Sequence, residues 1–507
     1  MKIIDKFKNK INGILSGFDR MIIKGHIRQF FSKSGKAYYM SQEGVLLKDF
    51  TEYAEGKTNQ IRSFIESYAK NEEKPIIYLN SSKVSKVQTA KDYLKNDPID
   101  EGLICIISAV EKNKSMRISK NKKEKKLELI NADKPSLHYY FYYLDKEFGF
   151  MHVKLQTWFP FGIQIYINGR EYIRKQLDKQ KIGYSMYDNS FTSIDDIETA
   201  QNLADKLQGK DLSNMFDHIA HNINPLLKEI EKIFNHSYYW CLDQCEYATD
   251  VMFKTREDLE LVYKDYVNHA IISFKADDVM TFLGRKMHHA FSGEVVSDTK
   301  NRIQGIRIKH RMKKNSIKMY DKNSVLRVET TINDPREFKI YKEVGINKEK
   351  KWVPMGKSIA NLYRYAQVSA SANKKYLDTI AQIDTNGESI KDIEKLCNRI
   401  TSKNHTYSAI NPLSKESEDI FVALFDNGNH INGFTNASIR KKLFPDSYND
   451  KRVSTKVTRL LRKYRAHKLI SKIPHSSKYK LTVKGIKIIS ACLIIKNEKY
   501  NTVSKAS

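Results

Sequence analysis

Residues 137–168 restrict the fold most strongly, because apolar and polar side chains alternate there over three successive segments. The segments are LHYYFYYL, FMHVKLQTWFPF and GIQIYINGRE, and the first two are joined by the turn sequence DKEFG. His152 and Lys154 fall on one face of the middle segment, and Val153 and Leu155 fall on the other. A period of two residues is typical of a β-strand. The sequence therefore predicts an antiparallel meander in this region.

The rest of the chain adds helices to this meander. The segments PIIYLN and GLICIISAV are short apolar strands on either side of an amphipathic helix at 82–94, which predicts a βαβ-like unit. Residues 1–70 and 196–291 have apolar side chains at helical spacing, so we expect both to be mainly helical. The second of them includes YYWCLDQCEYATDVMF at 238–253. The expected fold class is therefore α+β, with antiparallel or mixed sheets and helical insertions.

Residues 302–331 form a second alternating region, and this one is strongly basic. Between residues 302 and 327 there are nine lysines or arginines and one acid, Asp321. The alternation predicts a packed apolar face and a basic plane. We interpret the plane as a nucleic-acid surface, because each phosphate that it neutralises releases counterions; a solvated sheet face is the alternative. The expected contacts are Arg307, Lys309, Arg311, Lys313, Lys318 and Arg327.

The segment 451–480 combines a basic helix with a short basic hairpin. One apolar stripe recurs at helical spacing through Val453, Val457, Leu460, Leu461 and Tyr464, and basic or hydroxyl side chains cover much of the remaining surface. The following residues alternate as a strand, turn at 474–477 and return. This pattern predicts a winged helix-turn-helix, whose helix enters the major groove and whose wing contacts phosphates. The expected contacts are Arg452, Thr455, Lys456, Thr458, Arg459, Arg462 and Lys463 on the helix, and His475, Lys478 and Lys480 on the wing.

Composition favours a polyanionic partner and a reducing compartment. The 507 residues include 88 lysines and arginines against 59 acids, a formal net charge of +29. An AT-rich genome, which raises the lysine content, is the alternative explanation of this excess. Five scattered cysteines predict free thiols in the cytoplasm, and we expect neither a signal peptide nor a membrane span. The expected domains are an N-terminal helical region at 1–70, a central α/β region with the basic sheet at 71–345, a basic helical bridge and linker at 346–405, the winged helix domain at 406–496 and a tail at 497–507.

Part of the basic sheet resembles the rolling-circle replication initiators of plasmids and filamentous phages. The matching residues are Lys318-Met-Tyr320-Asp321-Lys322 and Arg327-Val-Glu329, which correspond to a Y-D-K … R-x-E signature. The resemblance implies an enzyme whose tyrosine attacks a DNA phosphate and stays attached to it. The chain departs from those enzymes in two respects: the upstream segment RIKHRMKKNS contains no tyrosine, and Lys154 stands where a metal-binding strand carries its second histidine. The whole chain also resembles a group of bacterial proteins of unassigned activity that share LQTWFPF, LRVETTINDPREF and the winged-helix ending RVSTKVTRLLRKYRAHKLI.

Acidic residues are the candidates for chemistry. In the helix expected at 238–253, Asp243, Glu246 and Asp250 are three and four residues apart and share one face. Three carboxylates on one stripe can hold Mg²⁺ for phosphodiester chemistry; a hydrated face that pairs with lysines is the alternative. The further candidates are Glu294, Asp298, Tyr320 and Glu329.

Three functional hypotheses follow. The first is a sequence-recognising nucleic-acid-binding protein, with DNA favoured, of the kind that plasmids or mobile elements use for replication or transposition. The second is a metal-dependent nuclease or strand-transfer enzyme that uses Mg²⁺, and no other cofactor is expected. The third is an RNA-binding protein that partners a structured RNA. The oligomeric state does not follow from the sequence.

Overall fold

The structure is a computed structural model that describes most of the chain. The described residues are 2–81, 83–123, 125–273, 276–284, 295–302, 305–345, 348–381, 393–402, 405–412, 414–425, 433–474, 476–486, 488–489 and 492–493. The chain divides into two units. The sheet unit comprises residues 11–254 and 329–371, and the second unit comprises residues 1–10, 255–328 and 372–507. Both contain helices and strands, so the α+β class is confirmed.

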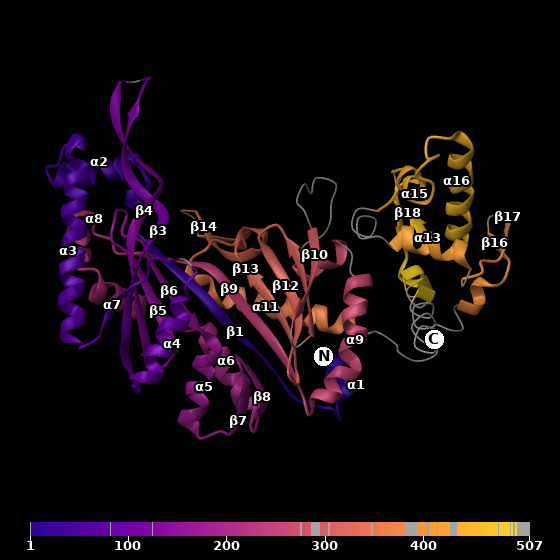
Figure 1. Cartoon of the computed structure of the whole chain (residues 1–507), viewed down its shortest axis with the longest axis horizontal. Coiled ribbons are helices and arrows are strands. Elements are labelled where there is room, and N and C mark those ends of the chain that lie inside the picture. Colours follow the sequence, from indigo (N-terminus) through magenta and orange to yellow (C-terminus); the bar gives the residue numbers. More distant parts are fainter. Residues whose placement is uncertain are drawn as a thin grey trace. The chain divides into compact units, whose positions relative to one another are not determined.

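The sheet unit is built on a large mixed sheet whose strands lie in the order β13, β9, β1, β6, β5, β4, β3 and β2 (Figure 1). The bounds are β1 Ile11–His26, β2 Ile76–Tyr78, β3 Gly102–Asn121, β4 Lys126–Asp145, β5 Gly149–Gln156, β6 Ile163–Asn168, β9 Tyr239–Phe253 and β13 Val325–Ile332. The antiparallel meander is confirmed as β4, β5 and β6. The βαβ-like unit is confirmed as β2, helix α4 (Lys86–Asn96) and β3, because β2 and β3 are parallel.

Two central strands occupy segments for which we predicted helices. The prediction is wrong for β1 in the N-terminal region and for β9 at 238–253, and these two strands pair antiparallel with each other. In β9 every residue from Cys245 to Phe253 is buried. A strand that is covered on both faces shows no alternation of apolar and polar residues. The spacing of its acids therefore matched a helix without indicating one.

The two faces of the meander differ in exposure. In β5 and β6 the odd-numbered residues are buried, and most even-numbered residues are partly exposed. Register joins the even-numbered residues across strands: Lys24 lies opposite Gln164, and Gln164 lies opposite Lys154. Residues opposite each other on neighbouring strands share a face. We call this side the open face, and its members are Arg20, Lys24, His152, Lys154, Gln164 and Tyr166.

Strands β3 and β4 continue beyond the meander as a long arm (Figure 1). Their pairing runs on to Asn121 and Lys126, whereas β5 pairs with β4 between His138 and Asp145. The helices of this unit are α2 Lys33–Gln42, α3 Phe50–Asn71, α4, α5 Gly169–Gln180, α6 Ile197–Gln208, α7 Ser213–Ile223 and α8 Leu227–Phe234. Its two hairpins are β7 Tyr184–Tyr187 with β8 Ser190–Ile194, and β14 Lys339–Val344 with β15 Glu349–Pro354.

Helix α5 is fixed against β1 and β9 at its first turn. The Asn168 side chain caps it by accepting hydrogen bonds from the backbone N–H groups of Arg170 and Glu171. A Cβ atom on Gly169 would lie 2.3 Å from the Phe18 carbonyl oxygen, so this close approach requires glycine. Arg170 is completely buried, and its Nη2 lies 3.0 Å from Asp250 Oδ2 on β9.

The second unit contains a smaller set of strands and the C-terminal helices. Its bounds are α1 Lys2–Phe7, α9 Arg256–Ser273, α10 Ala276–Phe282, β10 Val295–Arg302, β11 Gly305–Met312, β12 Asn315–Lys322, β16 Ile400–Ser402, β17 His405–Tyr407, α13 Lys415–Phe425, α15 Asn436–Leu443, α16 Lys451–Ala466, β18 Ile470–Lys472 and β19 Tyr479–Leu481. Helix α11 (Leu362–Ile380) crosses the division between the units at residue 371. The alternation at 302–331 predicted strands where the structure has β11, β12 and β13. Strand β11 pairs antiparallel with β12 and also with β10, which lies before the predicted region.

The C-terminal elements pack around one apolar core. The predicted stripe is confirmed for Val457, Leu461 and Tyr464 of α16, which are buried in this core, and Leu460 packs against it. Val453, the other predicted member, is only partly buried. Thr435 caps α15 with a capping box. Strands β18 and β19 form the predicted hairpin after α16. None of the helices in the described part of the chain is both long and apolar enough to cross a bilayer.

Replacing Asp250 with alanine should strongly destabilise the sheet unit. The change leaves the Arg170 cation buried without its carboxylate, and breaking a buried pair in this way costs about 3–5 kcal/mol. We expect the free energy of unfolding, measured with a chemical denaturant, to fall by that amount.

The exposed ion pair between Lys114 and Asp133, with an Nζ–Oδ1 distance of 3.0 Å, provides the control. Asp133→Ala should change the free energy of unfolding by less than about 1 kcal/mol, because water screens exposed pairs. Equal effects of the two substitutions would show that the Arg170–Asp250 pair is not a structural anchor.

Candidate metal centre

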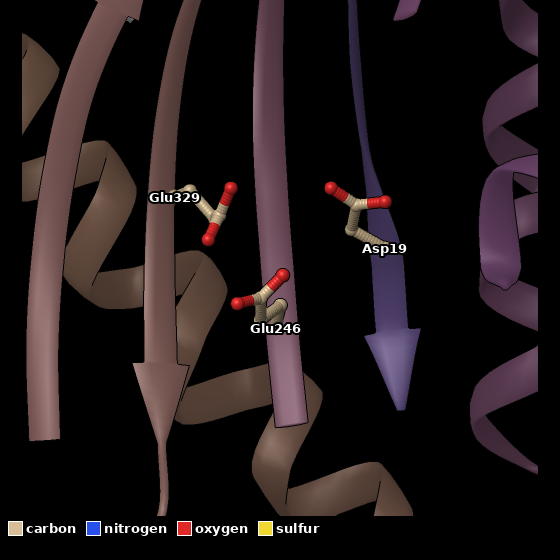
Figure 2. Close-up of side chains that lie close together, drawn as sticks. All are labelled: Asp19, Glu246 and Glu329. Carbon is tan, nitrogen blue, oxygen red and sulfur yellow. The ribbon is translucent and has the colours of Figure 1, made fainter. Parts of the chain in front are cut away.

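Three buried carboxylates meet on three neighbouring strands of the sheet unit (Figure 2). They belong to Asp19 on β1, Glu246 on β9 and Glu329 on β13, and one oxygen atom from each lies within 4.8 Å of the other two. The sheet order places β9 between β13 and β1. The side chains therefore converge because their strands are adjacent, and we call them the carboxylate triad.

An irregularity in the β1–β9 pairing brings two triad members face to face. The register shifts between Phe18 and Met21, so that Asp19 and Arg20 together lie opposite the single residue Glu246. Two residues opposite one is the arrangement of a β-bulge, which bends the strand and redirects its side chains. In a regular strand Asp19 and Arg20 would point to opposite faces, whereas here both reach the surroundings of Glu246.

Asparagine side chains hold Asp19 in place. Asn189, in the turn between β7 and β8, donates a hydrogen bond from Nδ2 to Asp19 Oδ1. Asn168 Nδ2 in turn donates to Asn189 Oδ1 at 2.8 Å, and its own Oδ1 caps α5. This chain of contacts fixes the orientation of the carboxylate, as outer hydrogen bonds commonly do around metal ligands.

Arg20 is the cation beside the triad. Its Nε lies 3.1 Å from Glu246 Oε2, and Gln244 Nε2 donates to Glu246 Oε1 at 3.1 Å. Burial alone would lower the pKa of Arg20, but the carboxylates of Glu246, Asp19 and Glu329 raise it above its usual value. The Arg20 side chain is still 48% exposed, so part of the guanidinium faces the open side of the sheet.

The other two acids of β9 have different partners. Asp243 lies 2.8 Å from Lys24 Nζ and 3.0 Å from Lys357 Nζ. Burial would raise its pKa, but these two lysines lower it below the usual range. Asp250 is paired with Arg170 inside the core. The structure therefore separates three acids that we predicted on one helix face.

The remaining catalytic candidates belong to the second unit or are not described. Asp298 is exposed and lies 2.6 Å from Arg307 Nη2. Tyr320 is buried, and the Arg302 guanidinium lies 4.9 Å from the centre of its ring. Glu294 lies outside the described residues. Neither Asp298 nor Tyr320 belongs to the triad.

Two of the predicted acids, Glu246 and Glu329, thus meet a third that we did not predict. Asp19 is a single acid within the apolar stretch 11–26, which we expected to be helical. The adjacent charges of Asp19 and Arg20 among mostly apolar residues were the signal that could have indicated it.

Part of the predicted basic plane exists on strands β11 and β12. Lys309 lies directly opposite Lys318, and Arg307 and Arg311 are at alternate positions of the same strand as Lys309. Burial and the positive charge of Lys318 lower the pKa of Lys309. Lys313 is exposed in the turn that joins the two strands. Like charges are therefore crowded at this surface.

The plane does not extend to β13, where the prediction for Arg327 is wrong. Arg327 is completely buried, as is every other residue of β13. Tyr320 and Glu329, which the alternation also placed on the basic plane, are buried as well. A strand covered on both faces cannot present its charged side chains to a partner from solvent.

The predicted contacts of the C-terminal helix lie mainly on its exposed side. The exposed ones are Arg452, Thr455, Lys456, Arg459 and Arg462. Lys463 is partly buried, and Thr458 donates a hydrogen bond to the Ser454 carbonyl and accepts one from Asn436. On the hairpin, Lys478 and Lys480 are exposed, and His475 lies outside the described residues. A cavity of about 780 Å³ runs between α16 and residues 405–411.

Comparison of the chain with protein-family models, with curated proteins and with solved structures finds no match. The donor atoms of the triad are therefore the starting point for its chemistry. Three carboxylates supply oxygen ligands without nitrogen or sulfur, which is the donor set that Mg²⁺ and Mn²⁺ prefer. Their separation and their position on rigid strands suit a single divalent cation.

Substitution of the triad should abolish tight binding of a divalent cation. We expect Mn²⁺, followed by electron paramagnetic resonance, to bind at one site per chain. Asp19→Asn and Glu246→Gln should each weaken binding by at least about 100-fold, because each removes a charged ligand.

Two further substitutions test the assignment of ligands. Asp243→Asn changes an acid on the same strand that lies outside the triad, and it should leave Mn²⁺ affinity within about twofold. Asn189→Ala removes the hydrogen bond to Asp19 and should weaken binding by about 10–100-fold, as is typical of outer contacts. An Asp243 variant as damaged as the triad variants would overturn the site.

Proposed function

We propose that the protein is a metal-dependent enzyme that cleaves phosphodiester bonds in nucleic acid, with DNA as the favoured substrate. The observation that carries this proposal is the convergence of three buried carboxylates beside an open sheet face that carries cations. A divalent cation held by the triad supplies Lewis-acid activation of the phosphate and of the attacking oxygen. Nucleic acid carries negative phosphates that would pair with the lysines, and it contains the phosphodiester bond on which such a cation would act.

Each residue around the triad has a role in this reaction. Arg20 contacts Glu246 and is half exposed, so its guanidinium can also bind a phosphate oxygen at the open face. Lys24 and Lys154 lie further along that face and bind neighbouring phosphates as point charges. Asn189 holds Asp19 in its orientation.

The open face also offers a ring pair for bases. His152 and Tyr166 are stacked, with ring centres 5.1 Å apart and planes 7° from parallel. Both are partly exposed. Burial lowers the pKa of His152 to about 4, so the imidazole is neutral at pH 7 and stacks as an uncharged ring. Bases of a single strand stack on aromatic side chains in this way.

Transfer of the strand to a tyrosine is the second candidate reaction, and Tyr166 favours it. This residue lies on the open face, and the charges of Arg20, Asp19 and Glu246 all act on its pKa. Its phenol oxygen would attack phosphorus and form a 5′-phosphotyrosine, while the other strand end leaves as a 3′-hydroxyl. Burial raises the pKa of Tyr166 to about 12, so a base must accept its proton. A bound cation would assist by stabilising the phenolate, and the departing 3′-oxygen takes up a proton to become the hydroxyl.

We further propose that residues 414–481 form a winged helix that binds duplex DNA. Helices α13, α15 and α16 are followed by the β18–β19 hairpin, and Phe434 forms a β-bridge with Tyr479 of that hairpin. The exposed side of α16 is basic, and its opposite side is packed. Such a module would position the catalytic unit at a chosen sequence, as plasmid and mobile-element proteins require.

Cleavage should depend on the triad and on the cation. We expect labelled single-stranded DNA to be cut in Mg²⁺ or Mn²⁺ and to remain intact in EDTA. Glu246→Gln and Glu329→Gln should reduce the rate by at least about 100-fold, because they remove ligands of the activating ion. Duplex DNA and RNA substrates of the same sequence establish the preferred nucleic acid.

Asp243→Asn is again the matched control and should keep at least about a third of the rate, given that an exposed pair contributes little. Tyr166→Phe separates the two reactions: hydrolysis survives it, whereas the covalent protein–DNA adduct of strand transfer does not form. A wild-type protein that binds DNA and metal without cutting any of the substrates would refute an enzyme.

Substitution of Arg459 should weaken duplex binding specifically. Arg459 lies in the middle of the exposed side of α16, so Arg459→Ala should cost about 1–3 kcal/mol for the preferred duplex if it contacts a base edge. Selection of a preferred sequence from random duplexes, followed by anisotropy, measures this loss.

Arg465→Ala is the control for this helix. Arg465 follows the buried Leu461 by four residues and therefore lies beside the packed side of α16. The Arg465→Ala substitution removes one positive charge, as Arg459→Ala does. It should change duplex affinity by less than about threefold at 0.15 M salt, where distant charges are screened. Equal losses from both variants would favour a general charge effect over a winged helix.

A further inference from the structure

A basic cavity opens on the sheet unit beside the open face. It has a volume of about 470 Å³. Its cationic lining residues are Lys24, Arg28, Lys112, Lys114 and Lys154. None of the described lining residues is an acid. We call it the basic pocket.

Acids behind the pocket neutralise only part of this charge. Asp243 is shared between Lys24 and Lys357. Glu111 is shared in the same way, at 2.6 Å from Lys154 Nζ and 2.9 Å from Lys86 Nζ. Asp133 also pairs with the lining residue Lys114, at 3.0 Å. Because Asp243 and Glu111 are each divided between two lysines, and the five lining cations outnumber these three acids, positive charge remains in excess. A surplus of this kind attracts a polyanion into the concave surface.

The pocket also has neutral groups that suit a base. Gln164 lines the pocket and is partly exposed. The amide of the buried Gln156 is already engaged, because its Nε2 donates to Ser115 Oγ at 3.1 Å and its Oε1 accepts from Asn113 Nδ2 at 3.1 Å. Phe31 is half exposed at the rim. Amide groups can bind the edge of a base, and an aromatic ring can stack on its face. Cations, amides and an aromatic ring together match the parts of a nucleotide.

Lys24 connects the pocket with the triad. It lines the pocket and lies on β1, four residues after Arg20, which contacts Glu246. At about 3.3 Å per residue, these positions are roughly 13 Å apart along the strand. A nucleic-acid strand on the open face can therefore reach both places.

We propose that the basic pocket binds one nucleotide of the single strand whose neighbouring phosphodiester lies at the carboxylate triad. This inference rests on the proposed function for the identity of the strand. The pocket is a separate binding site, however, and it holds the strand whether or not the triad carries a cation. Free nucleotides share the chemistry of the occupant, so the experiment must separate them from a strand.

The test measures binding of fluorescein-labelled oligothymidylate to the full chain by anisotropy, in EDTA, so that cleavage plays no part. Lys112→Ala/Lys114→Ala should weaken binding about tenfold and should reduce the slope of log affinity against log salt by about 1.4, because each phosphate that a lysine neutralises adds roughly 0.7 to that slope. Lys120→Ala/Lys122→Ala is the matched control, because it removes two exposed lysines from the same arm outside the pocket. It should change affinity by less than twofold.

A second variant fills the pocket without changing its charge. A Cβ atom on Gly162 would meet Gln156 Oε1 alone, at an ordinary 3.6 Å, so Gly162→Leu directs its side chain into the space. This variant should also weaken oligothymidylate binding about tenfold, with an unchanged salt slope. A thermal melt close to that of the wild type verifies that the variants are folded.

Three results would overturn the pocket. One is equal loss in the pocket and control double variants, and another is full binding by folded Gly162→Leu. The third is thymidine monophosphate competing as tightly as the oligonucleotide, which would make the occupant a free nucleotide; we expect the strand to bind at least about tenfold tighter. All three measurements are made on binding, so they can be interpreted even if the protein does not cleave DNA in Mg²⁺. A wrong proposal for the enzyme activity can therefore be distinguished from a wrong proposal for the basic pocket.

Discussion

The antiparallel pairing of β9 with β1 is the constraint on which the rest of the sheet unit depends. It places Glu246 opposite a bulge that carries Asp19 and Arg20, and the neighbouring strand β13 adds Glu329. Three carboxylates held within 4.8 Å in a buried place repel one another, and burial strengthens that repulsion. Backbone hydrogen bonds of the sheet fix the strands, so the side chains cannot move apart freely. Close like charges of this kind are most readily retained in a protein that uses them, for example to bind a cation.

The acids of β9 show how the position of a carboxylate decides its role. Asp243 is shared by two lysines at the edge of the open face, and Asp250 forms a completely buried pair with Arg170. Glu246 lies between them and faces both Arg20 and the other carboxylates. A buried ion pair supports the fold, because each charge has a counter-charge in place. The site where three carboxylates converge offers the donor atoms that a metal would use.

The sequence predicted those parts of the fold in which one face meets solvent. The meander at 137–168 and the stripe on α16 were both identified, because partial exposure leaves a regular pattern of polar residues. Strand β9 was missed for the opposite reason, since burial on both sides removes the alternation that distinguishes a strand from a helix. Strand β1 was missed although its second half alternates between buried and exposed residues, because the apolar spacing near its start also fits a helix. Two of the three triad residues were therefore among the predicted acids. Glu246 and Glu329 are recognisable as acids in unusual surroundings, but their meeting with Asp19 depends on strand order, which no local pattern specifies.

Carboxylates and lysines on the same side of one sheet also determine how metal and nucleic acid would affect each other. A phosphate that approaches Arg20 meets the negative triad behind it, and a cation in the triad removes that repulsion. The metal therefore tightens binding of the strand at this point, and thermodynamic reciprocity requires the strand to tighten binding of the metal by the same factor. Lys24 and Lys154, held by Asp243 and Glu111 further along, are farther from the triad and depend less on the ion. On the proposed function, the two ends of the open face would have different roles: the lysines would retain the strand without metal, and the triad would engage its phosphate once a metal is bound.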